Sequence, residues 1–290
     1  MKMIDYISYI DTDSLYINIE EFILNNINDK DKWINLSDET KIDYVLKISK
    51  VIENYVNDRS YIETQLIDYA SQVNDFRIMF KQEIIAKTAL FCKKKKYAYW
   101  VVSEEGIPTD ELAVKGLEIV RSDSAEAIRS RLSHIYELIM KQAPDSDIQK
   151  LIQKYKTELK SVSAEDIAAN IGINNINKYL STGTPLKGTP WHVKGVHNYR
   201  TLLHQFGLES KYEKIGEGGK AKVVYIKNNP FNMDTITFKK WPIEFDRYLD
   251  IDRELMIDKF FIKKIGFLLT PMNKMNLMQP DKSALFTLFK

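Results

Sequence analysis

Two aspartates, Asp11 and Asp13, lie two positions apart near the start of this 290-residue chain. Their neighbours in the run 6–19 are mostly β-forming tyrosines and isoleucines, so the run predicts a β-hairpin with Asp-Thr-Asp at its tip. Residues two apart on a strand share a face, and adjacent carboxylates repel each other unless a divalent cation lies near them. Hard oxygen ligands of this kind suit Mg²⁺. The alternative is two solvated turn residues, because Asp is common in turns.

The flanking residues extend the pattern to Tyr-Ile-Asp-Thr-Asp-Ser over positions 9–14. This six-residue stretch resembles motif C in the palm domain of family B DNA polymerases. The resemblance implies that Asp11 and Asp13 bind the catalytic Mg²⁺ and that Thr12 and Ser14 orient the turn. The activity it implies is that of a nucleotidyltransferase, which adds dNTPs to a DNA primer under the direction of a template.

Four consecutive lysines at 93–96 run straight into a strand-like segment rich in aromatic and β-branched residues. A lysine run is usually a solvated loop, but lysines projecting from the end of a buried strand form a fixed cationic ledge that can neutralise phosphates. By the same resemblance, Lys95 and Tyr97 match a Lys-x-Tyr motif that contacts the primer-template duplex, and Lys94 is a neighbour with the same role. Glu83 falls where the family has an acidic residue near the catalytic metals, a weaker match because it rests on a single residue.

The segment 114–123 resembles the family pattern that ends the palm and opens the thumb. It adds Lys115 and Arg121 to the expected DNA-binding residues, although an ion pair between Arg121 and Asp123 at the start of a helix is the alternative. From residue 124 onward the apolar spacing becomes helical, with Ser124 as the expected cap of the first helix and Ser163 as the cap of a short later one. Helices joined by short turns favour a bundle.

The segment 187–227 contains eight Lys and Arg residues and three acidic residues. A helix expected from Pro190 to Gly207 carries Lys194 and Arg200, which are further expected DNA contacts. The glycines at 216–219 lack the spacing of a phosphate-binding P-loop and are better explained as a hairpin turn ahead of a basic strand. This region resembles the thumb of T4-like phage polymerases.

The C-terminal part of the chain is expected to be separable. Asp252 is the predicted cap of a helix that ends near Ile265, and a flexible Met- and Asn-rich linker is expected over 272–280. The last ten residues hold two apolar pairs: Leu285, Phe286, Leu288 and Phe289. Exposed apolar pairs favour docking in a hydrophobic groove. The resemblance implies that this peptide binds a sliding clamp, and the alternative is that it folds back onto the thumb.

The net charge of +2 means that any nucleic-acid surface must come from local clusters of Lys and Arg. No apolar run is long enough to span a membrane and no signal-peptide pattern is present, so neither a membrane nor export is indicated. The single cysteine, Cys92, excludes an intramolecular disulfide and points to a reducing compartment. With the phage resemblance, the expected location is the cytoplasm of an infected host cell.

Taken in order, the motifs predict an α+β fold with the C-terminal part of a palm at 1–123. A mainly helical thumb with a small β element would follow at 124–270, and a flexible tail at 271–290. The family's motif A, its fingers motif and its exonuclease motifs are missing, and Asp11 and Asp13 alone cannot bridge two metal ions.

We therefore expect one subunit of a split polymerase, inactive without an N-terminal partner chain that supplies motif A, fingers and exonuclease. A fragment of a longer chain is the other explanation. The competing function is a non-catalytic DNA-binding or clamp-tethering accessory derived from a polymerase.

Overall fold

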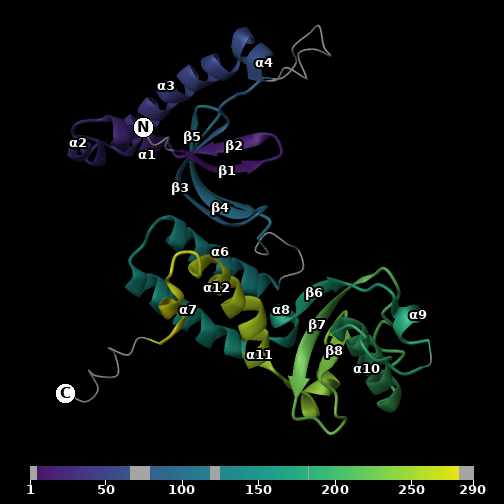
Figure 1. The fold of residues 1–290 in the computed structure, drawn as a ribbon. Helices are drawn as coiled ribbons and strands as arrows, with labels where there is room; N and C mark the ends of the chain where they lie inside the picture. The colour runs from purple at the N-terminus through teal and green to yellow at the C-terminus, as the bar shows by residue number, and fades with distance from the viewer. Residues whose placement is uncertain (1–4, 66–78, 118–124, 182, 281–290) are drawn as a thin grey trace, which may run out of the picture. The chain divides into compact units, whose positions relative to one another are not determined.

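The computed structural model describes residues 5–65, 79–117, 125–181 and 183–280. The chain divides into two compact units, Met1–Ala113 and Val114–Lys290 (Figure 1). Both units combine helices with antiparallel strands, which confirms the predicted α+β class.

The first unit contains a two-stranded hairpin and a three-stranded sheet. The hairpin occurs where the aspartate run predicts it, between residues 7 and 17, and its strands are β1 (Ile7–Asp11) and β2 (Ser14–Ile17). The sheet has the order β3-β4-β5. Its strands are β3 (Ile84–Lys93), β4 (Lys96–Glu104) and β5 (Ile107–Lys115).

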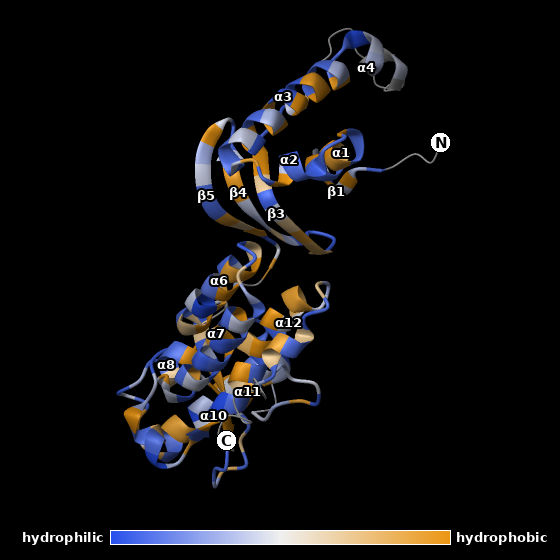
Figure 2. Ribbon diagram, turned by 90° about the vertical axis from the view of Figure 1, so that its left-hand side faces the viewer, coloured by the Kyte–Doolittle hydropathy of each residue, from blue (hydrophilic) through white to orange (hydrophobic). Residues whose placement is uncertain are grey.

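The described residues of the first unit also form the helices α1 (Ile19–Asn26), α2 (Lys30–Ile34), α3 (Asp38–Val56) and α4 (Arg59–Gln65). The Ser37 side chain accepts a hydrogen bond from the Thr40 backbone and caps α3, as N-terminal Ser followed by acids predicts. Polar and apolar residues intermix along α3 (Figure 2). No residue of this 19-residue helix is buried.

In the described part of the second unit, the first α-helices are α6 (Glu126–Met140), α7 (Asp145–Glu158) and α8 (Ala164–Ile167). Ala125 occupies the N-cap position of α6 and makes no side-chain cap bond. The cap expected at Ser124 lies outside the described residues. The second expected cap is confirmed, because Ser163 Oγ accepts a hydrogen bond from the Asp166 backbone at 3.1 Å. Pro144 occupies the N-cap position of α7.

A small sheet in the second unit packs against one helix. Its main strands are β6 (Ala169–Gly172), β7 (Lys220–Lys227) and β8 (Thr235–Phe238), and the short β9 (Asp250–Ile251) also pairs with β7. The helices that follow β6 are α9 (Ile176–Tyr179) and α10 (Trp191–Gln205), and α10 lies against β8 (Figure 1).

The glycine turn at 216–219 does not close a local hairpin, which corrects the sequence prediction. It leads into β7, but β7 pairs with β6, a strand some fifty residues earlier, and with β8. Two backbone bonds fix the turn beside β6: Gly218 N–H donates to the Ile173 carbonyl, and Ile173 N–H donates to the Gly219 carbonyl. The turn is therefore anchored by a long-range pairing that local composition does not encode.

The C-terminal helix runs further than predicted, through α11 (Arg253–Ile257), the π-helix η4 (Asp258–Ile262) and α12 (Lys263–Leu269). The Asp252 side chain caps it, as predicted, by accepting from Leu255 N–H. No helix in the described part of the chain is long and apolar enough to cross a membrane.

The prediction of a flexible linker over 272–280 is wrong. The 3₁₀-helix η5 (Met275–Met278) packs on α7, and its Leu277 is 3% exposed. Gln153 on α7 donates its side-chain amide to the Met278 carbonyl at 3.0 Å. The Met275 and Met278 side chains lie against Gly266 on α12, so this Met-rich segment is packed and not a free linker. Residues 281–290 lie outside the described residues.

Gly195 on α10 allows the close approach of this helix to β8. A Cβ atom there would collide with Thr237 Oγ1 and lie 2.8 Å from the Thr237 backbone nitrogen. Helix propensity alone favours Ala over Gly by about 0.8–1 kcal/mol. We nevertheless expect Gly195→Ala to lower the free energy of unfolding by about 1–3 kcal/mol, because overpacking dominates.

The measurement is urea denaturation followed by circular dichroism. Gly216→Ala is the matched control, because no atom lies within 4 Å of its added methyl group. Its effect should remain within about 0.5 kcal/mol. A stabilised Gly195→Ala variant would contradict the close contact between α10 and β8.

Candidate metal and nucleic-acid site

The two aspartates lie at the tip of the β1–β2 hairpin. Asp11 ends β1 and pairs with Ser14, while Thr12, with φ of 50°, and Asp13 form the turn. The Asp11 side chain is 20% exposed, and Asp13 is exposed. Because Asp13 is in the turn and not on a strand, the expectation that both aspartates share a strand face does not hold.

Two neighbouring hydroxyl groups hold the Asp11 end of the turn. Thr12 Oγ1 donates to Asp11 Oδ1 at 3.3 Å. Ser14 Oγ donates to the Asp11 backbone carbonyl at 3.0 Å. A hydroxyl bonded to a carboxylate and another bonded to the same residue's backbone restrict how Asp11 can rotate.

The lysine run forms the turn between β3 and β4 and leads straight into β4, as the sequence predicts. Lys93 ends β3, Lys96 begins β4, and the two residues pair with each other. Lys94 and Lys95 make the turn, and both are exposed. Lys95 has φ of 59°, in the left-handed region that few non-glycine residues adopt.

These two turns meet in space. The Lys95 backbone N–H donates to the Tyr9 hydroxyl oxygen at 2.6 Å, across 86 positions of sequence. The Lys95 ammonium nitrogen lies 4.0 Å from Asp11 Oδ1. The structure therefore brings the aspartate turn and the lysine turn together, and it places a cationic group beside one of the two carboxylates.

An aromatic cluster holds the hairpin against the sheet. The Tyr9 ring stacks on Phe91 with centroids 5.0 Å apart, and the Tyr16 ring lies 5.6 Å from that of Tyr97. The Tyr16 hydroxyl donates to the Tyr97 hydroxyl at 3.4 Å. Tyr97, expected to contact DNA, is 5% exposed and forms part of the core with Tyr99.

Burial controls the ionisation of the clustered tyrosines. Burial, helped by the bond with Tyr16, raises the pKa of Tyr97 well above its usual range. Burial also raises the pKa of Tyr99 to about 12. Both hydroxyl groups are neutral at physiological pH, as an unperturbed tyrosine would also be.

Sequence reasoning did not assign a role to Tyr9, Tyr16 or Phe91. The available signal was the concentration of aromatic residues on the two predicted strand regions, with Tyr9 and Tyr16 flanking the aspartates. That pattern indicates a packed face, but it does not identify which strand faces which.

Glu83 is not brought to the aspartate turn. It directly precedes β3, at the end of that strand opposite the lysine turn, and its carbonyl accepts from Glu105 N–H. Among the residues that the structure describes, no group of three or more His, Cys, Asp or Glu side chains could hold a metal ion. The carboxylates available for a metal at the turn are therefore those of Asp11 and Asp13.

The other expected DNA-binding residues are spread over the chain. Lys115 is exposed at the end of β5, and Arg121 lies outside the described residues. On α10, Lys194 forms an ion pair with Asp234 at 2.7 Å, and Arg200 donates to the Ile215 carbonyl at 2.6 Å. Both α10 side chains therefore help to fix neighbouring loops of the second unit.

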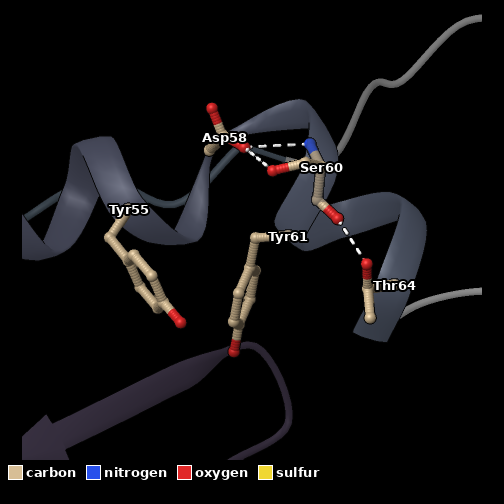
Figure 3. A pocket seen from close by; sticks show the side chains of 5 residues that line it. All are labelled: Tyr55, Asp58, Ser60, Tyr61 and Thr64. Atoms are coloured by element: carbon tan, nitrogen blue, oxygen red, sulfur yellow. Dashed lines mark hydrogen bonds between the residues drawn. The ribbon is translucent and has the colours of Figure 1, made fainter.

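A small open pocket lies between α3 and α4, lined by Tyr55, Asp58, Ser60, Tyr61 and Thr64 (Figure 3). Asp58 accepts hydrogen bonds from the Ser60 backbone and hydroxyl, and Thr64 Oγ1 donates to the Ser60 carbonyl. The bonds from Ser60 lower the pKa of Asp58. These polar groups satisfy one another as helix-start contacts do, so the pocket contributes no catalytic group.

A second hollow in the first unit is wholly apolar, with a volume of about 340 Å³. It lies between the base of the hairpin, α1 and α3, and its lining residues are Tyr6, Ile17, Ile19, Phe22, Ile48, Val51 and Ile52. The hairpin face beyond it is also apolar, because the paired residues Ile10 and Leu15 are 63% and 45% exposed. Exposed apolar residues gathered on one face are typical of contact sites.

Comparison with known proteins identifies the family. The sequence profile of DNA polymerase family B matches residues 6–185, which include the aspartate hairpin and the lysine turn. The chain belongs to DNA polymerase family B.

Its relatives include viral DNA polymerases. It is 26% identical to the DNA-directed DNA polymerase of Escherichia phage RB69, over 98% of this chain and 32% of that protein. It is 23% identical to the DNA-directed DNA polymerase of Enterobacteria phage T4, over 90% of this chain and 30% of that protein. The chain thus spans about a third of the length of these phage relatives.

Proposed function

We propose that this chain is the palm and thumb portion of a DNA-directed DNA polymerase and that residues 9–16 lie at the primer 3′ end. The observation that carries the proposal is the meeting of the aspartate turn and the lysine turn, since Lys95 contacts both Tyr9 and Asp11. A carboxylate pair and a cationic turn held side by side suit a reaction that joins a metal-bound nucleotide to a phosphate backbone.

Asp11 and Asp13 are the residues that would hold Mg²⁺. Their hard oxygen donors fit this ion, and the Lys95 ammonium already occupies a cation position 4.0 Å from Asp11 Oδ1. When bound, the metal supplies charge neutralisation for attack on the α-phosphate of an incoming dNTP. Thr12 and Ser14 orient the turn, a role supported by their bonds to Asp11.

The remaining proposed contacts bind the DNA backbone. Lys94 and Lys95 approach phosphates from the turn, while Tyr97 supports that turn from within the aromatic cluster. Lys115, Arg121, Lys194 and Arg200 stay proposed contacts, and the α10 pair would have to exchange its present partners for DNA. Backbone contacts position a duplex without reading its sequence, so sequence is read by base pairing with the template.

Replacing both Lys94 and Lys95 with Ala should weaken primer-template binding and flatten its salt dependence. Each lost phosphate contact lowers the slope of log K against log salt by about 0.9, so we expect a change of roughly 1–2. The measurement is fluorescence anisotropy of a labelled duplex between low and moderate salt.

The matched control replaces Lys47 and Lys50, which are exposed on α3 of the same unit, with Ala. This pair removes the same charge away from the turn and should leave the slope close to that of the wild type. If both double variants had the same slope of log K against log salt, the lysine turn would be a solvated loop that does not contact the duplex.

We also propose that the chain requires polymerase elements beyond its 290 residues. Two-metal transfer needs a further bridging carboxylate, and the described residues bring none to the aspartate turn. The apolar hollow and the exposed Ile10–Leu15 face fit a further part of the same polymerase packing on the hairpin. That part would carry motif A, fingers and exonuclease, on the same or another polypeptide.

The resemblance of the C-terminal peptide to a clamp-binding tail stays a proposal, since 281–290 lies outside the described residues. Burying one large apolar side chain contributes roughly 1.5–3 kcal/mol, and this peptide has four. Deleting residues 281–290 should leave single-nucleotide incorporation unchanged and shorten the products only when the cognate sliding clamp is present. Products shortened equally without the clamp would mean that the tail packs on the second unit.

The similarity to phage polymerases supports a virus-encoded protein that replicates DNA in the cytoplasm of an infected cell.

A further inference from the structure

Lys95 contacts the candidate site in two different ways. Its backbone N–H is bound to the Tyr9 hydroxyl at 2.6 Å, and the Tyr9 ring is stacked on Phe91. Its side chain is 66% exposed, and the ammonium nitrogen lies 4.0 Å from Asp11 Oδ1. The backbone of Lys95 is therefore anchored, while its long side chain keeps the freedom to move.

The charge near the turn explains why the ammonium group lies there. Asp11 and Asp13 place two negative charges within three residues, and a lysine ammonium beside Asp11 reduces their repulsion. A divalent cation on the same carboxylates would repel that ammonium group, because like charges a few ångströms apart disfavour each other. The ammonium and a metal ion thus compete for Asp11.

We infer that Lys95 couples metal binding to duplex binding: its ammonium neutralises Asp11 while no metal is bound, and a bound divalent cation releases it to contact a DNA phosphate. This inference rests on the proposed function of the aspartate turn. It assigns Lys95 a positioning role at the metal site, in addition to the proposed contact of its side chain with the DNA phosphate backbone.

The coupling must be reciprocal. If metal binding frees Lys95 for the duplex, duplex binding must strengthen metal binding by the same factor. Lys94, the other residue of the turn, provides the contrast, because the structure records an ion pair with Asp11 for Lys95 and none for Lys94 in the described part of the chain.

The experiment uses the complete 290-residue chain and two readouts that need no polymerase activity. Tb³⁺ is a hard cation that takes oxygen ligands, and its luminescence can be excited through the tyrosines packed beside Asp11. We expect Lys95→Ala to strengthen Tb³⁺ binding about two- to fivefold, the size typical of an exposed ion pair. Lys95→Arg should restore the wild-type affinity, and Lys94→Ala should change it by less than half as much.

The second readout is the affinity for a labelled primer-template duplex, with and without Mg²⁺, at constant ionic strength. Mg²⁺ should tighten duplex binding by about two- to fivefold in the wild type and in Lys94→Ala, and should have no such effect in Lys95→Ala. Unchanged or weaker Tb³⁺ binding by Lys95→Ala, or an equal gain in Lys94→Ala, would overturn the inference.

Two further variants separate failure of this inference from failure of the proposed function. Asp11→Asn and Asp13→Asn should each weaken Tb³⁺ binding. If neither does so, the metal site itself is wrong and the proposed function fails with it. If both do so while Lys95→Ala has no effect, the metal site stands and only the coupling is rejected.

Discussion

Asp13→Ala is expected to reduce DNA synthesis at least a hundredfold while leaving duplex binding nearly unchanged. The substitution removes a proposed metal ligand, and charge stabilisation by a bound metal contributes several kcal/mol to a phosphoryl-transfer barrier. Asp13 is exposed in the turn, so its loss leaves no buried group without a partner and does not disturb the aromatic cluster. The measurement is single-turnover dNTP incorporation by the chain combined with the rest of its polymerase, beside a duplex-binding assay.

Two further variants serve as comparison and control for Asp13→Ala. Asp11→Ala should be milder than Asp13→Ala, because by family resemblance the second acid of the motif is the closer metal ligand. Asp43→Ala, at an exposed carboxylate on α3, should behave as the wild type. If Asp13→Ala kept more than about a tenth of the wild-type rate, a barrier change of only about 1.4 kcal/mol, its role as metal ligand would be untenable.

The second large effect concerns the chain by itself, which should not extend a primer. The described residues offer two carboxylates at the turn, and a two-metal reaction needs another that bridges both ions. Adding a polypeptide that carries motif A and the fingers should restore synthesis from an undetectable level. The assay is extension of a labelled primer with Mg²⁺ and all four dNTPs.

The apolar face of the first unit provides a structural control for this restoration. Leu15→Glu places a charge on the exposed hairpin face away from the aromatic cluster, and Ile10 is its cross-strand partner. This variant should bind duplex normally but require more of the added polypeptide for the same rate, because a buried unpaired charge opposes association. Robust extension by the purified single chain would refute the requirement for further elements.

Much of the local structure could be predicted from the sequence. The β-forming residues around Asp11 predicted the hairpin, and Ser163 predicted the cap of α8. Asp252 predicted the start of the C-terminal helix in the same way. These features depend on residues within one or two turns of each other, so the signal is complete in a short window.

The structural features that were not predicted from the sequence depend mainly on long-range contacts. The bond from Lys95 to the Tyr9 hydroxyl spans 86 positions, and no periodicity encodes which strands face each other. The same limit explains why β7 was expected in a local hairpin although it pairs with β6. The prediction of a flexible linker over 272–280 was wrong for another reason. Met-rich composition does not distinguish a linker from a segment packed on a helix.

The central claim is that the primer 3′ end lies at the meeting point of the aspartate and lysine turns. The most direct test is photocrosslinking of the 290-residue chain to a primer-template whose primer ends in a photoreactive nucleotide, followed by mass spectrometry of the linked peptides. The account predicts crosslinks within residues 9–16 and 93–97, and their loss at high salt. Reproducible crosslinks confined to other parts of the chain would contradict it.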